Sequence, residues 1–151
     1  MKILVVGLGS MGRRRIRFLQ KIDRSIEIIG VDSQETRCYQ VQEEFNISTR
    51  NDLELAVDEE KPQAVVISTS PLSHAYIIKV CLQKNCHVFT ELNLIADGYE
   101  ENIGLAKKLN KVLFLSSTFL YREEIQYIQK KVVEGGTQVN YNYHVGQYLA
   151  D

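Results

Sequence analysis

Three glycines near the start of the chain have the spacing of a phosphate-binding loop. Residues 7–12 read GLGSMG and lie between the apolar run KILVV and an amphipathic segment rich in arginine. Gly7 would allow a tight turn, Gly9 the close approach of a pyrophosphate, and Gly12 the packing of a helix against a strand. The free N–H groups and positive end of that helix would hold the phosphates. The alternative is an ordinary strand-to-helix turn, so the neighbouring residues must decide.

An acidic residue follows the glycines at the distance expected of a dinucleotide site. A second predicted strand ends at Val31, and Asp32 lies 20 residues after Gly12. A carboxylate there would accept hydrogen bonds from both hydroxyls of an adenosine ribose, but would repel the 2′-phosphate of NADP. Arg37 could offset this repulsion, although its distance of one helical turn favours a solvated side chain. The pattern therefore predicts a nucleotide cradle that prefers NAD, with NADP the less favoured cofactor.

Short β-rich runs alternate with amphipathic helices, and this order must position the loop. Strands are expected at 2–6, 26–31, 46–49, 64–69, 87–90 and 112–115, and helices at 11–22, 35–45, 51–60, 71–84, 99–109 and 123–134. Asn51 with Glu54 resembles a capping box, and Ser70-Pro71 an N-cap with a proline at the first helical position. Repeated βαβ units predict an α/β fold, a doubly wound parallel sheet of the Rossmann type.

The last segment has a different pattern. Residues 137–148 alternate strictly, with valines and tyrosines on one face and Asn140, Asn142 and His144 on the other. This is typical of an antiparallel strand with one buried face. We expect a dinucleotide-binding domain over 1–120 and, over 121–151, the first helix and strand of a truncated second domain. The unpaired strand would pair with another copy or pack back on the domain, so a homo-oligomer is expected.

Composition excludes several classes of partner. The formal net charge is −1, and the apolar runs are far shorter than a membrane span, so neither nucleic acid nor a membrane is expected as a partner. No cleavable signal is apparent, which favours a cytoplasmic location. The three cysteines, an odd number, suit a reducing compartment. Cys81, Cys86 and His87 invite a metal interpretation, but no second pair of ligands exists, and buried thiols explain them better.

The middle of the chain resembles a known family. The segment VVISTSPLSHAYIIKVCLQKNCHVFTELNL is similar to the N-terminal domain of the Gfo/Idh/MocA family, named after glucose–fructose oxidoreductase and inositol dehydrogenase. Thr69, Pro71, His74 and Glu91 stand where that family has a strand ending near Thr-x-Pro, a nearby histidine and a strand ending in Glu-Lys-Pro. The resemblance implies that the loop from Ser68 to Pro71 lies along the cofactor, that His74 is near it, and that Glu91 approaches the nicotinamide ribose. For His74, helix capping or packing is an equal alternative.

The sequence departs from the family at its lysine. The family's Glu-Lys-Pro is Glu91-Leu92-Asn93 here, and Leu92 can neither orient a hydroxyl nor assist proton transfer. Asn93 could hydrogen-bond a sugar but is no general base. His144 is not assigned as the catalytic base, so no catalytic residue is assigned within the chain.

The resemblance implies the cofactor half of an oxidoreductase that moves a hydride between NAD and a hydroxyl of a sugar, cyclitol or nucleotide sugar. A non-catalytic NAD-binding sensor or partner module is the alternative, since the family lysine is absent. A Rossmann-like domain for another nucleotide ranks third. The expected cofactor-binding residues are Gly7, Gly9, Ser10, Met11, Gly12, Asp32, Arg37, Ser68, Thr69, Pro71, His74 and Glu91. Asn93 is the substrate-side candidate, and no metal site is expected.

Overall fold

The computed structural model describes residues 1–91, 96 and 98–136. The chain divides into two compact units, Met1–Ser116 and Ser117–Asp151, and each is considered by itself. The first unit holds a sheet of six strands, all parallel, in the order β3-β2-β1-β4-β5-β6. The strands are β1 (Lys2–Val6), β2 (Glu27–Val31), β3 (Ser48–Arg50), β4 (Ala64–Ile67), β5 (His87–Glu91) and β6 (Leu113–Ser116).

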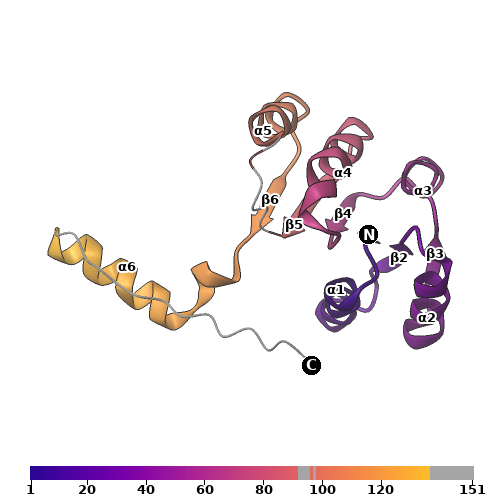
Figure 1. Ribbon diagram of the computed structural model, residues 1–151, viewed down its shortest axis with the longest axis horizontal. Coiled ribbons are helices and arrows are strands. Elements are labelled where there is room, and N and C mark those ends of the chain that lie inside the picture. The colour runs from indigo at the N-terminus through magenta and orange to yellow at the C-terminus, as the bar shows by residue number, and fades with distance from the viewer. Residues whose placement is uncertain (92–95, 97, 137–151) are drawn as a thin grey trace. The chain divides into compact units, whose positions relative to one another are not determined.

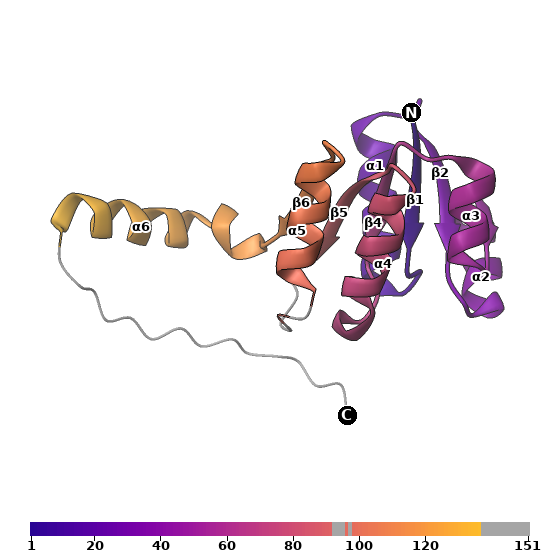
Figure 2. The same ribbon diagram turned by 90° about the horizontal axis from the view of Figure 1, so that it is seen from above.

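Helices cover both faces of this sheet. They are α1 (Ser10–Ile22), α2 (Glu35–Phe45), α3 (Leu53–Glu60), α4 (Pro71–Gln83) and α5 (Tyr99–Lys108). Figure 1 shows α3, α4 and α5 on one side of the sheet and α1 and α2 on the other, and Figure 2 shows the same layers from above. The doubly wound α/β fold expected from the alternating pattern is confirmed, because the chain crosses from one face to the other between its first and second halves.

The alternation of side chains along β1 explains why the sheet has an apolar core on each of its faces. In β1, Leu4 and Val6 belong to the core under α3, α4 and α5, whereas Ile3 and Val5 belong to the core under α1 and α2. Successive side chains of a strand point to opposite faces, so a continuous apolar run fits a strand buried on both sides. All four of these residues are buried.

Several predicted helix and strand boundaries were wrong by one or two residues, and two of these errors have a clear local cause. Asp52, not Asn51, is the N-cap of α3, and its side chain accepts a hydrogen bond from the N–H of Leu55 at 2.9 Å. The strand expected at 46–49 begins only at Ser48, because Asn46 takes a left-handed conformation with φ +52° that ends α2. By contrast, α4 begins at Ser70 and Pro71 as expected, although the Ser70 side chain makes no capping bond.

The second unit contains a 3₁₀ turn at Thr118–Tyr121 and the helix α6 (Glu123–Gly135). The helix ends one residue after the expected 134, and Gly136 follows it in a left-handed conformation with φ +58°. The strand predicted over 137–148 lies outside the described residues, as do Leu92 and Asn93. Among the helices that the structure describes, none has the length and apolar character needed to cross a bilayer.

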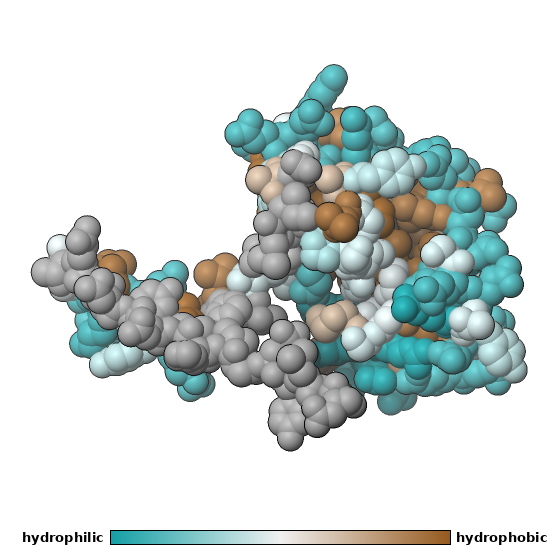
Figure 3. Space-filling model, in the orientation of Figure 1, coloured by the Kyte–Doolittle hydropathy of each residue, from teal (hydrophilic) through white to brown (hydrophobic). Residues whose placement is uncertain are grey.

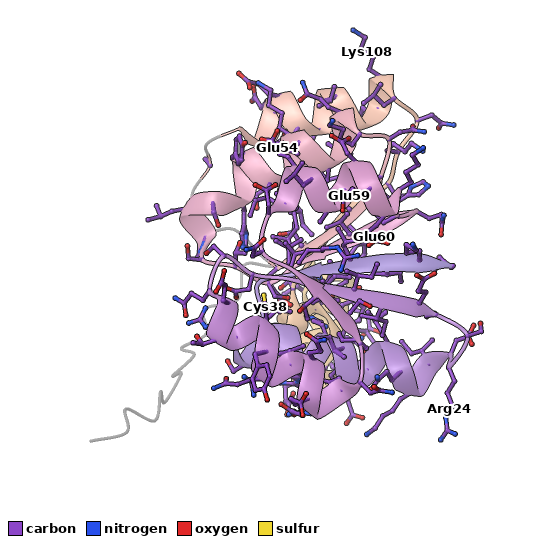
Figure 4. The ribbon with its side chains drawn as sticks, turned by 90° about the vertical axis from the view of Figure 1, so that its right-hand side faces the viewer. Arg24, Cys38, Glu54, Glu59, Glu60 and Lys108 are labelled. Carbon is purple, nitrogen blue, oxygen red and sulfur yellow. The ribbon has the colours of Figure 1, made fainter. Side chains whose placement is uncertain are left out.

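The cysteines lie in the core of the first unit. Cys81 and Cys86 are fully buried, and Cys86 Sγ donates to the carbonyl of Pro62 at 3.5 Å. The ring of His87 is also engaged, since its Nδ1 accepts the N–H of Val112 at 3.0 Å. Cys38 lies on the side of α2 that faces the sheet (Figure 4). In the described part of the chain, no group of three metal-ligating side chains is close enough to hold a metal ion.

Gly12 allows a test of how closely α1 packs against the end of β1. A Cβ on Gly12 would overlap the carbonyl oxygen of Gly7, whereas a Cβ on Gly104 in α5 would meet nothing within 4 Å. We therefore expect Gly12→Ala to lower the free energy of unfolding by ~3 kcal/mol or more, because backbone rather than a flexible side chain must move. Gly104→Ala should raise it by about 0.5–1 kcal/mol through helix propensity. Urea unfolding measures both, and equal stability of the two variants would contradict the packing argument.

The buried thiols provide a second test. Burial raises the pKa of the Cys81 thiol to about 12 and also raises the pKa of Cys38 and Cys86. The native protein should therefore react slowly with iodoacetamide at pH 8, while the urea-unfolded chain should label at all three cysteines. A folded pKa above the unfolded value means that the thiols stabilise the fold fully below pH ~9 and that this contribution is lost as the pH rises toward 12. Rapid labelling of the native protein would contradict this interpretation.

Candidate functional site

The glycine loop joins β1 to α1 at the carboxyl edge of the sheet. Gly7 has φ +89°, a conformation that favours glycine, and its N–H donates to the carbonyl of Val31 at 2.8 Å. A Cβ there would lie 2.8 Å from the backbone of Ser68 and 2.9 Å from a methyl carbon of Thr69. Gly7 therefore lets the loop turn tightly against the end of β4, which is one of the two neighbours of β1.

Gly9 differs from the other two glycines, because nothing in the described protein requires it. Its backbone is extended, at φ −70° and ψ −163°, which any residue can adopt, and a Cβ there would meet nothing within 4 Å. Gly9 caps α1 without any side-chain hydrogen bond, and the first turn of α1 contains no acidic residue. The positive end of the helix is therefore left uncompensated next to open space, which is the arrangement of an anion site.

Asp32 holds the loop in place. The side chain is only 7% exposed, and Oδ2 accepts the N–H of Leu8 at 2.8 Å while Oδ1 accepts the N–H of Gln34 at 2.9 Å. Arg37 Nη1 lies 3.5 Å from Oδ2. The Arg37 side chain is 45% exposed, as expected of a solvated residue, but the first turn of α2 also brings the guanidinium back over the carboxylate. Asp32 also has a backbone anchor, since the thiol of Cys38 donates to its carbonyl at 3.2 Å.

A cleft of about 520 Å³ opens at this edge of the sheet. It is lined by Val6, Gly7, Gly9, Val31, Asp32, Ser33, Arg37, Asn51, Leu53, Ser68, Thr69, Ser70, Ser73, Tyr76 and Ile77. Six of the predicted residues are thus brought together, namely Gly7, Gly9, Asp32, Arg37, Ser68 and Thr69. Figure 3 shows apolar residues gathered in the middle of the first unit and surrounded by hydrophilic ones. Such an apolar floor with a few polar groups is typical of a small-molecule site.

The wall formed by α3 and α4 was missed by sequence reasoning. Tyr76 and Ile77 lie on α4, Leu53 at the start of α3, and the hydroxyl of Tyr76 donates to Glu54 at 2.5 Å. This bond raises the pKa of Tyr76, because the neighbouring carboxylate disfavours a phenolate. No motif marks these residues. They reach the cleft only because the two helices cover the same face of the sheet.

One polar atom in the cleft wall has no partner. The hydroxyl of Ser68 is buried and makes no hydrogen bond within the described residues, although the Ser68 N–H donates to the carbonyl of Val6 at 2.8 Å. Buried hydroxyls are nearly always hydrogen-bonded, so this one fits a group that a ligand would bring. The neighbouring Thr69 hydroxyl is already satisfied, because it accepts a bond from Ser73 at 2.8 Å.

His74 lies beneath the loop rather than in the cleft. It is 1% exposed, and its Nε2 donates to the carbonyl of Thr69 at 3.0 Å, while Nδ1 lies 3.4 Å from the hydroxyl of Thr90. These contacts agree with the packing interpretation of His74, and a role near the cofactor stays a prediction. Pro71 and the helical residues Ser10 and Met11 do not line the cleft either.

Glu91 ends β5 and forms an ion pair with Arg15 of α1. Arg15 Nε donates to Glu91 Oε1 at 2.8 Å, and Nη2 of the same guanidinium also donates to Oε1. Arg13 and Arg17 of the same helix both pair with Glu44 of α2. Glu44 follows Arg17 by 27 residues and Glu91 follows Arg15 by 76, so these pairs depend on how the chain folds.

Two further clefts lie at the opposite edge of the sheet. One, of about 500 Å³, is lined by residues that include Lys61, Lys84 and Lys111, and the other, of about 680 Å³, includes Lys21 and Arg24. Basic side chains there are explained by the carboxyl-terminal ends of the helices, which favour positive charge. Neither cleft contains a glycine loop or a helix N-terminus.

Comparison with known proteins agrees with this geometry. Residues 1–117 match the family model described as an oxidoreductase family with an NAD-binding Rossmann fold, GFO_IDH_MocA. The myo-inositol 2-dehydrogenase of Thermotoga maritima is 26% identical over 140 residues, which are 91% of this chain and 42% of that protein. The chain thus spans about two fifths of the length of this relative.

Solved structures show the same fold at lower identity. The WlbA dehydrogenase of Bordetella pertussis, in complex with NADH and UDP-GlcNAcA, superposes with a TM-score of 0.81 at 16% identity, over 90% of this chain and 43% of that one. KijD10, a 3-ketoreductase of Actinomadura kijaniata in complex with NADP, gives a TM-score of 0.76 at 19% identity, over 89% and 42%. The glycine loop, the carboxylate after β2 and the family match together show that the chain belongs to the Gfo/Idh/MocA oxidoreductase family and contains its NAD-binding Rossmann domain.

Proposed function

We propose that this chain forms the cofactor half of an NAD-dependent dehydrogenase that acts on a hydroxyl of a cyclitol or a nucleotide sugar. Gly9 is the observation that supports this most directly. Neither its conformation nor its packing requires glycine, so the absent side chain is explained by a ligand that approaches the backbone closely. The substrate class is taken from the family's cyclitol relative and from the sugar nucleotide bound by WlbA.

The residues of the cleft fit a dinucleotide. The N-terminus of α1, with Gly7, Gly9, Ser10, Met11 and Gly12 around it, would hold the pyrophosphate through backbone N–H groups. Bound nicotinamide would supply the hydride chemistry, and the protein would supply binding and orientation.

The remaining polar residues would fix the two ends of the cofactor. Asp32 would accept the adenosine ribose hydroxyls with the lone pairs that Leu8 and Gln34 leave free. Ser68 would gain the hydrogen bond that its buried hydroxyl lacks within the described residues. Thr69, Pro71 and His74 would shape the loop that passes the diphosphate, and Glu91 would approach the nicotinamide ribose.

The substrate and its general base would be held outside the first unit. We assign 121–151 to the start of a second domain, with Asn93 as a substrate-side candidate and Leu92 in place of the family lysine. The proton of the substrate hydroxyl must then leave by a group other than that lysine, because an aliphatic side chain accepts no proton.

The first test adds one methyl group to the cradle. Gly9→Ala should weaken NAD binding about tenfold or more, which is ~1.4 kcal/mol, because the methyl group occupies the space that the pyrophosphate needs. Its urea midpoint should match the wild type, since that methyl meets no protein atom. Calorimetry measures the affinity, and Gly104→Ala, equally uncrowded but in α5, is the matched control. Unchanged affinity in Gly9→Ala would overturn the assignment of the cradle.

The second test concerns the choice between NAD and NADP. Arg37→Ala should weaken NADP binding several-fold and leave NAD nearly unchanged, because the guanidinium is the positive group next to Asp32. Asp32→Ala should weaken NAD binding and raise the affinity for NADP relative to that for NAD, since the carboxylate that repels the 2′-phosphate is gone. The same change leaves the Leu8 N–H without its acceptor and should cost about 1–3 kcal/mol of stability, measured by urea unfolding. Parallel losses of NAD and NADP affinity in Asp32→Ala would show that the carboxylate acts only through the fold.

A further inference from the structure

We propose that Arg15 positions Glu91 for the nicotinamide-side ribose of the cofactor, so that α1 acts on both the pyrophosphate and the nicotinamide half of the bound dinucleotide. The inference rests on the proposed function, because it assumes that the cleft holds such a ligand. Arg15 touches no ligand in this scheme and acts through Glu91. It is therefore a positioning residue.

The register of the sheet places Glu91 beside the cleft. Thr90 of β5 is level with Ile67, the last residue of β4, so Glu91 is level with the chain that continues into Ser68. Alternation then decides which way each side chain points. Phe89 packs with the core under α1 and α2, whereas Thr90 faces His74 of α4. Glu91 therefore points to the same face as Phe89, toward α1.

The contacts of Arg15 hold one oxygen of the Glu91 carboxylate and leave the other oxygen available to a ligand. Both donated bonds end on Oε1, and within the described residues no hydrogen bond ends on Oε2. The guanidinium carbon lies 4.9 Å from the centre of the Phe89 ring, and Phe89 stacks on Phe114 at 5.4 Å. An arginine held by a ring and by a carboxylate loses less freedom for each bond formed. Oε2 is thus a fixed acceptor at the edge of the sheet where ligands bind.

A second ion pair made by α1, Arg17 with Glu44, serves as a control for the Arg15–Glu91 pair. Arg17 pairs with Glu44 at 2.9 Å and lies 5.6 Å from the Phe45 ring, so its chemistry matches that of Arg15. The Arg17 side chain is 55% exposed, whereas that of Arg15 is 19% exposed. Exposed pairs contribute little to stability, so the Arg17–Glu44 pair is not needed for the fold to form. The more buried Arg15–Glu91 pair can contribute to stability, so urea unfolding of the variants must accompany the binding measurements. What distinguishes Arg15 is its partner at the end of β5.

Charge gives a second reason for an arginine at this position. An ionised Glu91 would be repelled by a pyrophosphate held at the N-terminus of α1, since both are negative. Arg15 neutralises that carboxylate from the first half of the same helix. Loss of Arg15 should therefore harm binding of the nicotinamide half through both orientation and charge.

The experiment compares two ligands on the full chain. NADH is titrated by nicotinamide fluorescence, and ADP is titrated by calorimetry as a probe of the adenosine half alone. Arg15→Ala should weaken NADH binding about fivefold or more, change the emission of bound NADH, and leave ADP binding within twofold of the wild type. Glu91→Gln should weaken NADH binding less than Arg15→Ala does, because it removes the carboxylate acceptor together with the repelling charge, and the double variant should be no worse than Arg15→Ala. Arg15→Lys should restore part of the loss, while Arg17→Ala should match the wild type.

Each outcome distinguishes the two proposals. If the wild type binds neither ADP nor NADH, the proposed function fails and this inference fails with it. If the wild type binds both, but Arg15→Ala behaves as Arg17→Ala does, Arg15 does not position Glu91 and only this inference is overturned. Urea midpoints are measured for every variant. If Arg15→Ala is unfolded, Arg15→Lys, which keeps the charge but not the guanidinium donors, decides the outcome by the same titrations. Weaker NADH binding with unchanged ADP binding supports the inference, and wild-type NADH binding overturns it.

Discussion

The contact between the backbone of Gly12 and the carbonyl of Gly7 determines where α1 begins and how it leaves the sheet. Because residue 12 has no side chain, the first turn of α1 can lie directly over the end of β1. That position directs the helix N-terminus into the cleft and gives Asp32 its bond to the Leu8 N–H. It also places Arg15 within reach of Glu91, 76 residues further along the chain. The loop, the acidic residue and the inferred positioning pair all depend on one close backbone approach.

Much of the fold follows from local pattern. The alternation of apolar runs with amphipathic helices predicts all six strands and the helices between them, since the spacing of apolar residues differs between a helix and a buried strand. The errors are local as well. Asn51 and Asp52 are adjacent and both suit a helix cap, so the sequence could not decide between them. The left-handed Asn46, which shortens the third strand, has no marker stronger than the residue type itself.

The site is predicted less completely, because its contacts join distant segments. Gly7, Gly9 and Asp32 have a spacing that can be read along the chain, and the structure places all three around one cleft. The burial of His74 beneath Thr69 and the pairing of Arg37 with Asp32 depend on how helices pack, which no local pattern encodes. The same holds for the partners of the α1 arginines. Arg13 pairs with an acidic residue on α2 and Arg15 with one on β5, and only the folded chain brings these groups together.

Asp32 has consequences for how this cradle could change during evolution. Its two oxygens accept the N–H groups of Leu8 and Gln34, and we propose that the same carboxylate also binds the adenosine ribose. A single substitution that favours NADP would most simply replace Asp32. Such a substitution would also remove the hydrogen bond that holds the Leu8 amide and the glycine loop. A lineage that switches cofactor would need a compensating acceptor for the Leu8 amide, gained before or together with the loss of Asp32. Because Asp32 would serve both the loop structure and cofactor selection, the cofactor preference should change slowly during evolution.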